Sequence, residues 1–213
     1  KQPSQVEDAI TKGVKAIVIN PLNKDATKTV LNDAVKRNIP IVTVDTTVEG
    51  VELLADVSTD NYDGGKFAAE WLTKKSGFTP ETLAGIVHMK GIDGHTAHIG
   101  RYGGFNDYLK SAEAGEAWNE FTLSNKYKEV TGNFAQDVAR NAMDDIISSL
   151  DKNGTYVVYA ENDVMAIGVY ESIKNTSGYD IKNFKIIGFD GSAKGKQLVD
   201  EGNVIISYAK VTN

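Results

Sequence analysis

The chain has 213 residues, of which 41% are hydrophobic and 24% are charged, a balance typical of a soluble globular protein. Its formal net charge of −6 argues against a nucleic-acid partner, because such proteins usually present a basic surface. It contains no cysteine, which excludes disulfides, thiolate catalysis and cysteine-ligated metals and is compatible with an exported protein. The apolar runs have only the length of a strand, so we expect no insertion into a membrane.

Short β-branched runs alternate with amphipathic helices along the chain. Before Asp60 the pattern predicts a helix at the start, strands at 15–20 and 39–44, and a helix over 26–35, after which the chain runs through 53–57. After Asp60, which we expect to cap a helix over 61–72, strands are predicted at 84–89, 128–130, 155–159, 184–187 and 204–208. Helices are predicted over 97–112, 134–150, 162–174 and 193–201, and residues 111–127 as a helix end plus a surface loop. This alternation predicts an α/β fold with parallel sheets and helices on both faces.

The part of the chain before Asp60 holds only two clear strands, too few for a sheet that stands alone. Residues outside the chain, or a second copy of it, would have to complete that sheet. The polar start at Lys1 reads as the middle of a helix and carries no signal peptide. We therefore favour the hypothesis that the chain is truncated at both ends and that it binds its ligand weakly in isolation.

Hydrogen-bonding residues follow several predicted strands at their carboxyl ends, where ligands bind in open α/β sheets. Asn20, Asp45, Asn162 and Asp190 hold these positions. Carboxylates and carboxamides suit a polyhydroxylated ligand, since each can bind two hydroxyl groups at once. Phe134, at the start of a predicted helix, offers an apolar platform for the C–H face of a sugar ring.

Each of these residues also has a purely structural interpretation. Asn20 precedes Pro21 and can shape a turn, and Asn162 can be a helix N-cap. Asp190 can bond the amides of its own turn, and Phe134 falls in register with an apolar helical stripe. The functional interpretation depends on the coincidence of these residues at one edge.

Patterns that would indicate catalysis are weak. The glycines of 188–196 have the wrong spacing for a phosphate-binding loop, and Gln197 stands where Ser or Thr would bind magnesium. His95, His98 and Asp93 have metal-like spacing but fit polar surface better. Asp45 and Asp190 could form a glycosidase pair, yet neither has an evident environment that raises a pKa. We therefore expect no enzyme activity, no cofactor and no metal.

Six short motifs follow one another along the chain. They are Gly13-Val-Lys-Ala-Ile-Val-Ile-Asn-Pro21, Ile39-Pro-Ile-Val-Thr-Val-Asp45, Thr59-Asp-Asn61 with Gly64-Gly65, Arg101-Tyr-Gly-Gly-Phe105, Ala160-Glu-Asn-Asp-Val-Met-Ala166 and Ile187-Gly-Phe-Asp-Gly191. Together they resemble the ribose-type periplasmic sugar-binding proteins of ABC transporters, over essentially the whole chain. The resemblance implies the type I periplasmic-binding-protein fold, in which two doubly wound, Rossmann-like lobes joined by a hinge close on a sugar. Here the first lobe would be partial, with residues 1–59 and 209–213, and residues 60–208 would form the second lobe.

The resemblance also implies sugar contacts from Asn20, Asp45, Asn162 and Asp190 and stacking by Phe134. Departures from the ribose-binding pattern concern four further candidates. Thr46 and Ile99 stand where ribose binders carry arginines, Lys210 stands where a glutamine near the hinge reaches the ligand, and His98 could line the site. The loss of two guanidinium groups argues against ribose itself and favours another pentose, a hexose or a less polar furanose-like sugar.

The function that the resemblance implies is capture of a small sugar and its delivery to a membrane ABC transporter permease. The protein would be periplasmic or extracellular, anchored as a lipoprotein if Gram-positive, and a monomer at full length. Two other classes stay open, the ligand-binding core of a LacI-type transcription regulator and the sugar-sensing domain of a membrane receptor. Gly191 at the end of Gly188-Phe-Asp-Gly191 favours transport proteins, since regulators commonly carry an acidic residue there.

Overall fold

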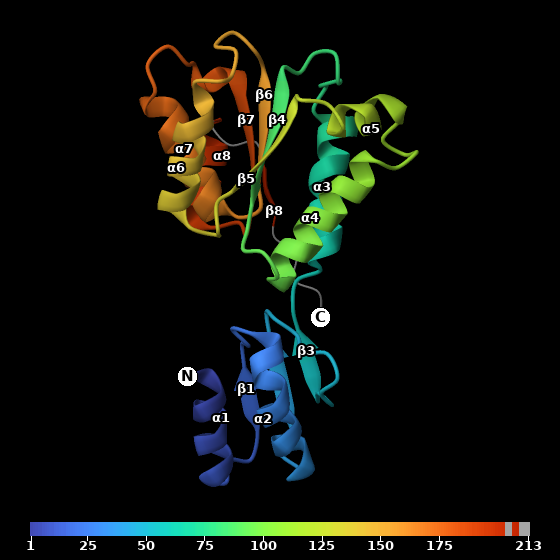
Figure 1. Ribbon diagram of the computed structural model, residues 1–213, viewed down its shortest axis with the longest axis vertical. Helices are drawn as coiled ribbons and strands as arrows, with labels where there is room; N and C mark the ends of the chain where they lie inside the picture. The colour runs from blue at the N-terminus through green and yellow to red at the C-terminus, as the bar shows by residue number, and fades with distance from the viewer. Residues whose placement is uncertain (203–205, 209–213) are drawn as a thin grey trace. The chain divides into compact units, whose positions relative to one another are not determined.

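A computed structural model of the protein describes residues 1–202 and 206–208. These residues form two compact units, and each is described by itself (Figure 1). We call residues 1–60 the first unit and the described residues from Asn61 to Tyr208 the second unit.

The first unit is a small parallel sheet with two helices. Its elements are α1 (Gln2–Thr11), β1 (Ile17–Ile19), α2 (Lys24–Lys36), β2 (Ile41–Val44) and β3 (Ala55–Val57), and the strands lie in the order β1-β2-β3. The Asn23 side chain caps α2 by accepting a hydrogen bond from the Ala26 amide at 2.9 Å. Asn38, with φ of 57°, takes the left-handed conformation that ends helices.

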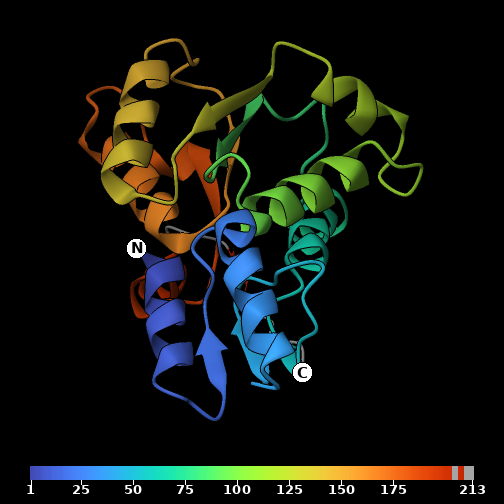
Figure 2. The same cartoon turned by 60° about the horizontal axis from the view of Figure 1, so that its bottom comes forward.

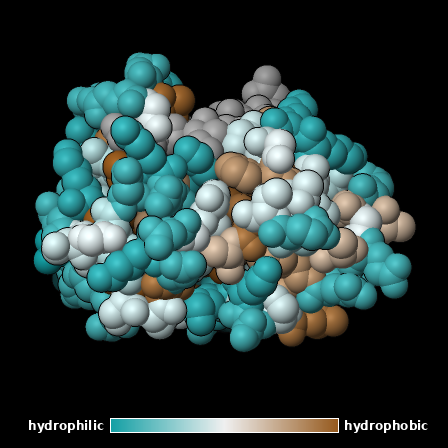
Figure 3. Space-filling model, turned by 90° about the horizontal axis from the view of Figure 1, so that it is seen from above, coloured by the Kyte–Doolittle hydropathy of each residue, from teal (hydrophilic) through white to brown (hydrophobic). Residues whose placement is uncertain are grey.

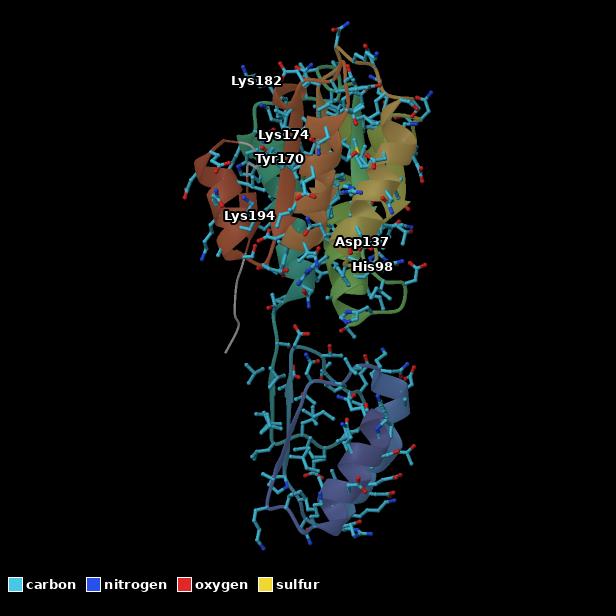
Figure 4. The ribbon with its side chains drawn as sticks, turned by 90° about the vertical axis from the view of Figure 1, so that its left-hand side faces the viewer. His98, Asp137, Tyr170, Lys174, Lys182 and Lys194 are labelled. Atoms are coloured by element: carbon cyan, nitrogen blue, oxygen red, sulfur yellow. The ribbon has the colours of Figure 1, made fainter. Side chains whose placement is uncertain are left out.

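Both helices of the first unit pack on the same face of its sheet (Figure 2). The core is aliphatic, with Val6, Ile10, Ile17, Ile19, Val30, Leu31, Ala34, Ile39, Ile41 and Val48 buried. The opposite face carries Val18, Val44 and Val57, which are 70%, 38% and 43% exposed. Figure 4 shows the helices on one side of the strands only. The prediction of helices on both faces is therefore wrong for this sheet within the described residues.

The second unit is a larger α/β layer structure. Its strands are β4 (Gly85–Lys90), β5 (Tyr127–Thr131), β6 (Tyr156–Ala160), β7 (Phe184–Phe189) and β8 (Ile206–Tyr208), all parallel in the order β5-β4-β6-β7-β8. Its α-helices are α3 (Asn61–Glu70), α4 (Thr96–Leu109), α5 (Glu116–Thr122), α6 (Gln136–Ile147), α7 (Asp163–Asn175) and α8 (Ala193–Asp200). A π-helical turn, Trp71–Lys75, extends α3, and a short 3-10 helix, Ile181–Asn183, precedes β7.

Helices cover both faces of this second sheet, because successive strand residues point to opposite sides. Tyr156, Val158 and Ala160 lie on one face and pack against α6, α7 and α8. Val157 and Tyr159 lie on the other face and pack against α3, α4 and α5. Figure 1 shows these two helical layers on either side of the strands. Here the predicted arrangement is confirmed.

Helices α3 and α4 pack unusually closely, and this fixes the position of Arg101. A Cβ atom at Gly65 would overlap the Arg101 carbonyl oxygen, and one at Gly104 would overlap the Tyr62 carbonyl oxygen. Only glycine allows the two backbones to approach so far. Arg101 is thereby held against the start of α3.

Two local predictions are wrong. Helix α5 lies in the stretch that was expected to be a loop, and it buries Trp118 and Phe121. Two apolar residues in a seven-residue helix give too little periodicity to detect. Helix α6 begins at Gln136, so Phe134 precedes it, and the buried stripe runs through Ala139, Met143 and Ile147.

Candidate functional site

In the first unit the structure brings Asn20 and Asp45 together, as the sequence predicts. They follow the neighbouring parallel strands β1 and β2, and Asn20 Nδ2 lies 3.4 Å from Asp45 Oδ2. The Asn20 backbone carbonyl accepts a hydrogen bond from Gln2 Nε2 at 2.7 Å, which ties this loop to α1. Thr46 is 5% exposed, and its hydroxyl has no hydrogen-bond partner among the described residues. A ligand could reach that hydroxyl only if the loop shifted.

In the second unit Phe134, Asn162 and Asp190 follow β5, β6 and β7, and they lie at what we call the carboxyl edge of the sheet. Asn162 is the N-cap of α7, and its Oδ1 accepts a hydrogen bond from the Met165 amide at 2.9 Å. The side-chain NH₂ group remains the part that can donate to a ligand. The Asp190 side chain is 43% exposed, and Phe134 is half-buried against the core.

Three of the predicted residues have a left-handed backbone that is unusual outside glycine. The φ angles are 68° at Asp45, 54° at Phe134 and 109° at Asp190. Such conformations cost roughly 1–3 kcal/mol each and cluster at functional sites. Phenylalanine in particular gains nothing locally from this conformation, since it lacks the short polar side chain of Asn or Asp. The strained positions therefore favour a functional interpretation over a turn or a plain helix start.

Arg101 connects the segments that carry these residues. Its guanidinium carbon lies 3.7 Å from the centre of the Phe189 ring, and its Nη2 lies 3.4 Å from Asp190 Oδ1. Its Nε donates to Asn61 Oδ1 at 2.9 Å, and its Nη1 donates to the Glu161 carbonyl. The side chain is only 9% exposed. Arg101 stands in one of the family-like sequence motifs, but no sugar contact was predicted from it.

Glu161 forms a buried polar network directly behind Asn162. Its carboxylate accepts hydrogen bonds from His88 Nε2 at 2.9 Å, from His98 Nδ1 at 2.8 Å and from the Gly91 amide at 2.9 Å. Figure 4 shows His98 at the end of the second unit where α4 begins. His98 therefore supports the buried carboxylate, and its Nε2 lies 3.6 Å from the exposed Asp93.

The electrostatics of this network favour an ionised Glu161. Burial raises the pKa of the Glu161 carboxyl, but hydrogen bonds and charge from His88 and His98 outweigh it and hold the pKa below its ordinary value of 4.5. The Tyr127 hydroxyl lies 2.8 Å from His88 Nδ1. Burial is the main cause that raises the pKa of this hydroxyl well above its ordinary value of 10.0. The tyrosine is therefore a neutral partner.

Asp163 holds the loop that carries Asp190. It is buried, and its Oδ2 accepts a hydrogen bond from the Ser192 amide at 2.7 Å. Its only sequence signal was its place beside Asn162 after a strand.

Two further candidates from the sequence are Ile99 and Lys210. Ile99 is 54% exposed on the first turn of α4, whereas Lys210 lies outside the described residues.

Pockets also lie elsewhere on the described surface, and one of about 390 Å³ in the first unit is lined by residues that include Val35, Pro40 and Leu53. Figure 3 shows the end of the second unit where its strands begin as mostly hydrophilic, with scattered apolar residues. A shallow pocket there, of about 270 Å³, is lined by residues that include Ala84, Lys126 and Tyr156. Within residues 1–202 and 206–208 no group of three potential ligands could hold a metal ion. No helix in the same ranges is long and apolar enough to cross a bilayer.

Comparison with known families assigns the chain to one of them. The family model described as periplasmic binding protein domain matches residues 1–210. The chain belongs to this family. Its fold is accordingly the type I periplasmic-binding-protein fold, and the family resemblance is confirmed.

Relatives of the chain include ribose import binding proteins. The chain is 25% identical over 214 residues to the ribose import binding protein of Escherichia coli (strain K12), covering 99% of this chain and 65% of the relative. It is 31% identical over 194 residues to the ribose import binding protein of Bacillus subtilis (strain 168), covering 90% of this chain and 56% of the relative. The chain thus spans less than two thirds of the length of these relatives.

Solved structures agree with this assignment. The periplasmic binding protein of the arabinose ABC transporter from Shewanella sp. ANA-3, bound to L-arabinofuranose, superposes with a TM-score of 0.78 at 26% identity. The Caulobacter myo-inositol binding protein, bound to myo-inositol, gives 0.79 at 25% identity. Each superposition covers 95% of this chain and 64% of the other.

Proposed function

We propose that this chain is the sugar-binding part of a solute-binding protein, which captures a small sugar and delivers it unchanged to a membrane ABC transporter. The observation that carries the proposal is the convergence of Phe134, Asn162 and Asp190 at one sheet edge, two of them on strained backbone. A donor, an acceptor and an apolar ring together match the hydroxyls and the C–H face of a sugar.

Within the first unit Asn20 and Asp45 form an amide–carboxylate pair with the same chemistry. We assign the first unit to part of one lobe and the second unit to the other lobe of the family fold. The protein would act in the periplasm or outside the cell. The sugar would bind one conformation of the protein more tightly and shift the population toward it. No bond in the sugar would be made or broken.

The sugar is expected to be another pentose, a hexose or a less polar furanose-like sugar, because an apolar side chain replaces a guanidinium group at Ile99. Ile99 exposes an apolar side chain on the first turn of α4, and Ile92, in the loop after β4, is 44% exposed. Helical side chains lean toward the N-terminus, so Ile99 leans toward the carboxyl edge. Relatives bind ligands that include L-arabinofuranose, myo-inositol and, in an Agrobacterium vitis protein at 27% identity, D-fucose.

The test is isothermal titration of the chain with D-ribose, D-allose, L-arabinose, D-fucose and myo-inositol. We expect saturable binding of at least one of them, and a loss of at least about tenfold in affinity in Asp190→Asn, which removes a charge-assisted acceptor. Asp137→Asn, on the exposed part of α6, is the matched control and should bind like the wild type. Absence of binding to every sugar, or wild-type affinity in Asp190→Asn, would refute the proposal.

A further inference from the structure

Arg101 lies where three chain segments of the second unit meet. Its Nε contacts Asn61 at the start of α3, and its Nη1 contacts Glu161, the residue before Asn162. Its Nη2 lies 3.4 Å from Asp190 Oδ1. A guanidinium group has its donors in one rigid plane, so it fixes the relative positions of all three segments.

Stacking on Phe189 determines the orientation of that plane. The guanidinium carbon sits 3.7 Å from the ring centre and 6.0 Å from the centre of the Phe134 ring. The charged group is thus enclosed between aromatic rings and a carboxylate, where Coulomb interactions are weakly screened. The arginine side chain is 9% exposed, whereas that of Asp190 is 43% exposed. The carboxylate therefore faces outward while its charge partner lies behind it.

We propose that Arg101 is a positioning residue for sugar binding, which holds the Asp190 carboxylate in its binding orientation from behind the site. This inference rests on the proposed function. The backbone of Asp190, at φ of 109°, is in a costly conformation that persists only where surrounding contacts hold it. A carboxylate that is already fixed loses less side-chain entropy when a ligand arrives, which raises affinity.

A double-mutant cycle tests whether Arg101 acts through Asp190. The variants are Arg101→Met, Asp190→Asn and the double variant, with Arg101→Lys as the conservative change and Arg140→Met on exposed α6 as the matched control. Affinities for D-ribose, D-allose, L-arabinose, D-fucose and myo-inositol are measured by isothermal titration. Ligand-free unfolding is followed by the fluorescence of Trp71 and Trp118, which both belong to the second unit.

We expect Arg101→Met to weaken binding by about tenfold or more, and Asp190→Asn to do the same. The double variant should bind no worse than the weaker single variant, within about threefold, because both changes remove one arrangement. Arg101→Lys should recover folding stability but not full affinity, since an ammonium group cannot bridge three segments. If Arg101→Met fails to fold, the affinity of Arg101→Lys still tests the inference.

Two results would overturn the inference while leaving the proposed function intact. One is wild-type affinity in Arg101→Lys and Arg101→Met, and the other is multiplication of the two single effects in the double variant. A merely structural role would lower unfolding stability and leave the affinity of the folded protein unchanged. If the wild type binds none of the five sugars, the proposed function fails and the inference fails with it.

Discussion

The two units differ in the residues that form their cores and in how completely their sheets are covered. Residues 1–60 contain no Phe, Tyr or Trp, and their three-stranded sheet is covered on one face only. The second unit holds every aromatic residue of the chain and covers its five-stranded sheet on both faces. Parallel sheets are normally buried on both sides, so the second unit has the more complete core.

The same contrast extends to the candidate site. In the first unit Asn20 and Asp45 share one long hydrogen bond near the surface. In the second unit the residues around Asn162 and Asp190 are supported by buried groups, chiefly Glu161, Arg101 and Asp163. A site supported in this way is preorganised, whereas an exposed pair must be ordered when the ligand binds. The comparison predicts that mutations behind the second-unit site have much larger effects than those at the first-unit pair.

The largest effect is expected from Glu161→Ala. The change leaves His88, His98 and the Gly91 amide without their acceptor, and breaking a buried charged network costs about 3–5 kcal/mol. Urea unfolding followed by Trp71 and Trp118 fluorescence measures it. Asp45→Asn, in the exposed pair of the first unit, keeps a residue that tolerates φ of 68° and should change the free energy of unfolding, followed by circular dichroism, by less than about 0.5 kcal/mol. Equal effects of the two variants would contradict the comparison.

The next effect concerns two valines in equivalent strand positions. Val158→Ala, at a fully buried position of β6, should lower the free energy of unfolding by about 2 kcal/mol through lost burial and a cavity. Val18→Ala, at a 70% exposed position of β1, should change stability by less than about 0.5 kcal/mol. Circular dichroism during urea unfolding follows both. A large loss in Val18→Ala would mean that the open face is covered in solution.

A smaller effect, on binding alone, is expected from Gly91→Ala. A Cβ atom there would overlap the Phe134 ring, so the ring must move. Because Phe134 is half-buried and outside α6, we expect a small loss of stability but about tenfold weaker sugar binding, the size of one aromatic contact. Titration with the five ligands measures it, and Gly103→Ala in α4, where a Cβ atom makes only ordinary contact with Tyr62, is the control. Unchanged affinity would remove Phe134 from the site.

The smallest expected effect is the pH dependence due to Glu161. Its pKa is lowered in the folded state, so its contribution to stability is complete above the ordinary value of 4.5 and is lost as pH falls through the lower folded-state value. In Glu161→Gln this part of the acid dependence should disappear, although the variant is less stable at neutral pH. Fluorescence-monitored unfolding of both proteins across the acid range provides the test. Parallel acid dependences would mean that the pKa is not lowered.

Much of this architecture is predictable from the sequence. Short β-branched runs identified the strands and apolar stripes identified most helices, and the rule that parallel strands end at one edge predicted that Asn162 and Asp190 lie at the same edge. Arg101 and Glu161 were not predictable as partners, because their contact joins α4 to the residue after β6, 60 positions further along the sequence. The position of Phe134 before α6 also escaped, because its register matched the apolar stripe by coincidence.

The most direct test of the central claim is a map of where a sugar binds. Backbone amide NMR spectra of the chain are recorded while D-ribose, D-allose, L-arabinose, D-fucose and myo-inositol are added in turn. The account predicts saturable shifts, for at least one sugar, centred on Phe134, Asn162 and Asp190, and their loss in Asp190→Asn. Shifts centred instead on the pocket around Lys126 and Tyr156, or no shifts with any sugar, would contradict it.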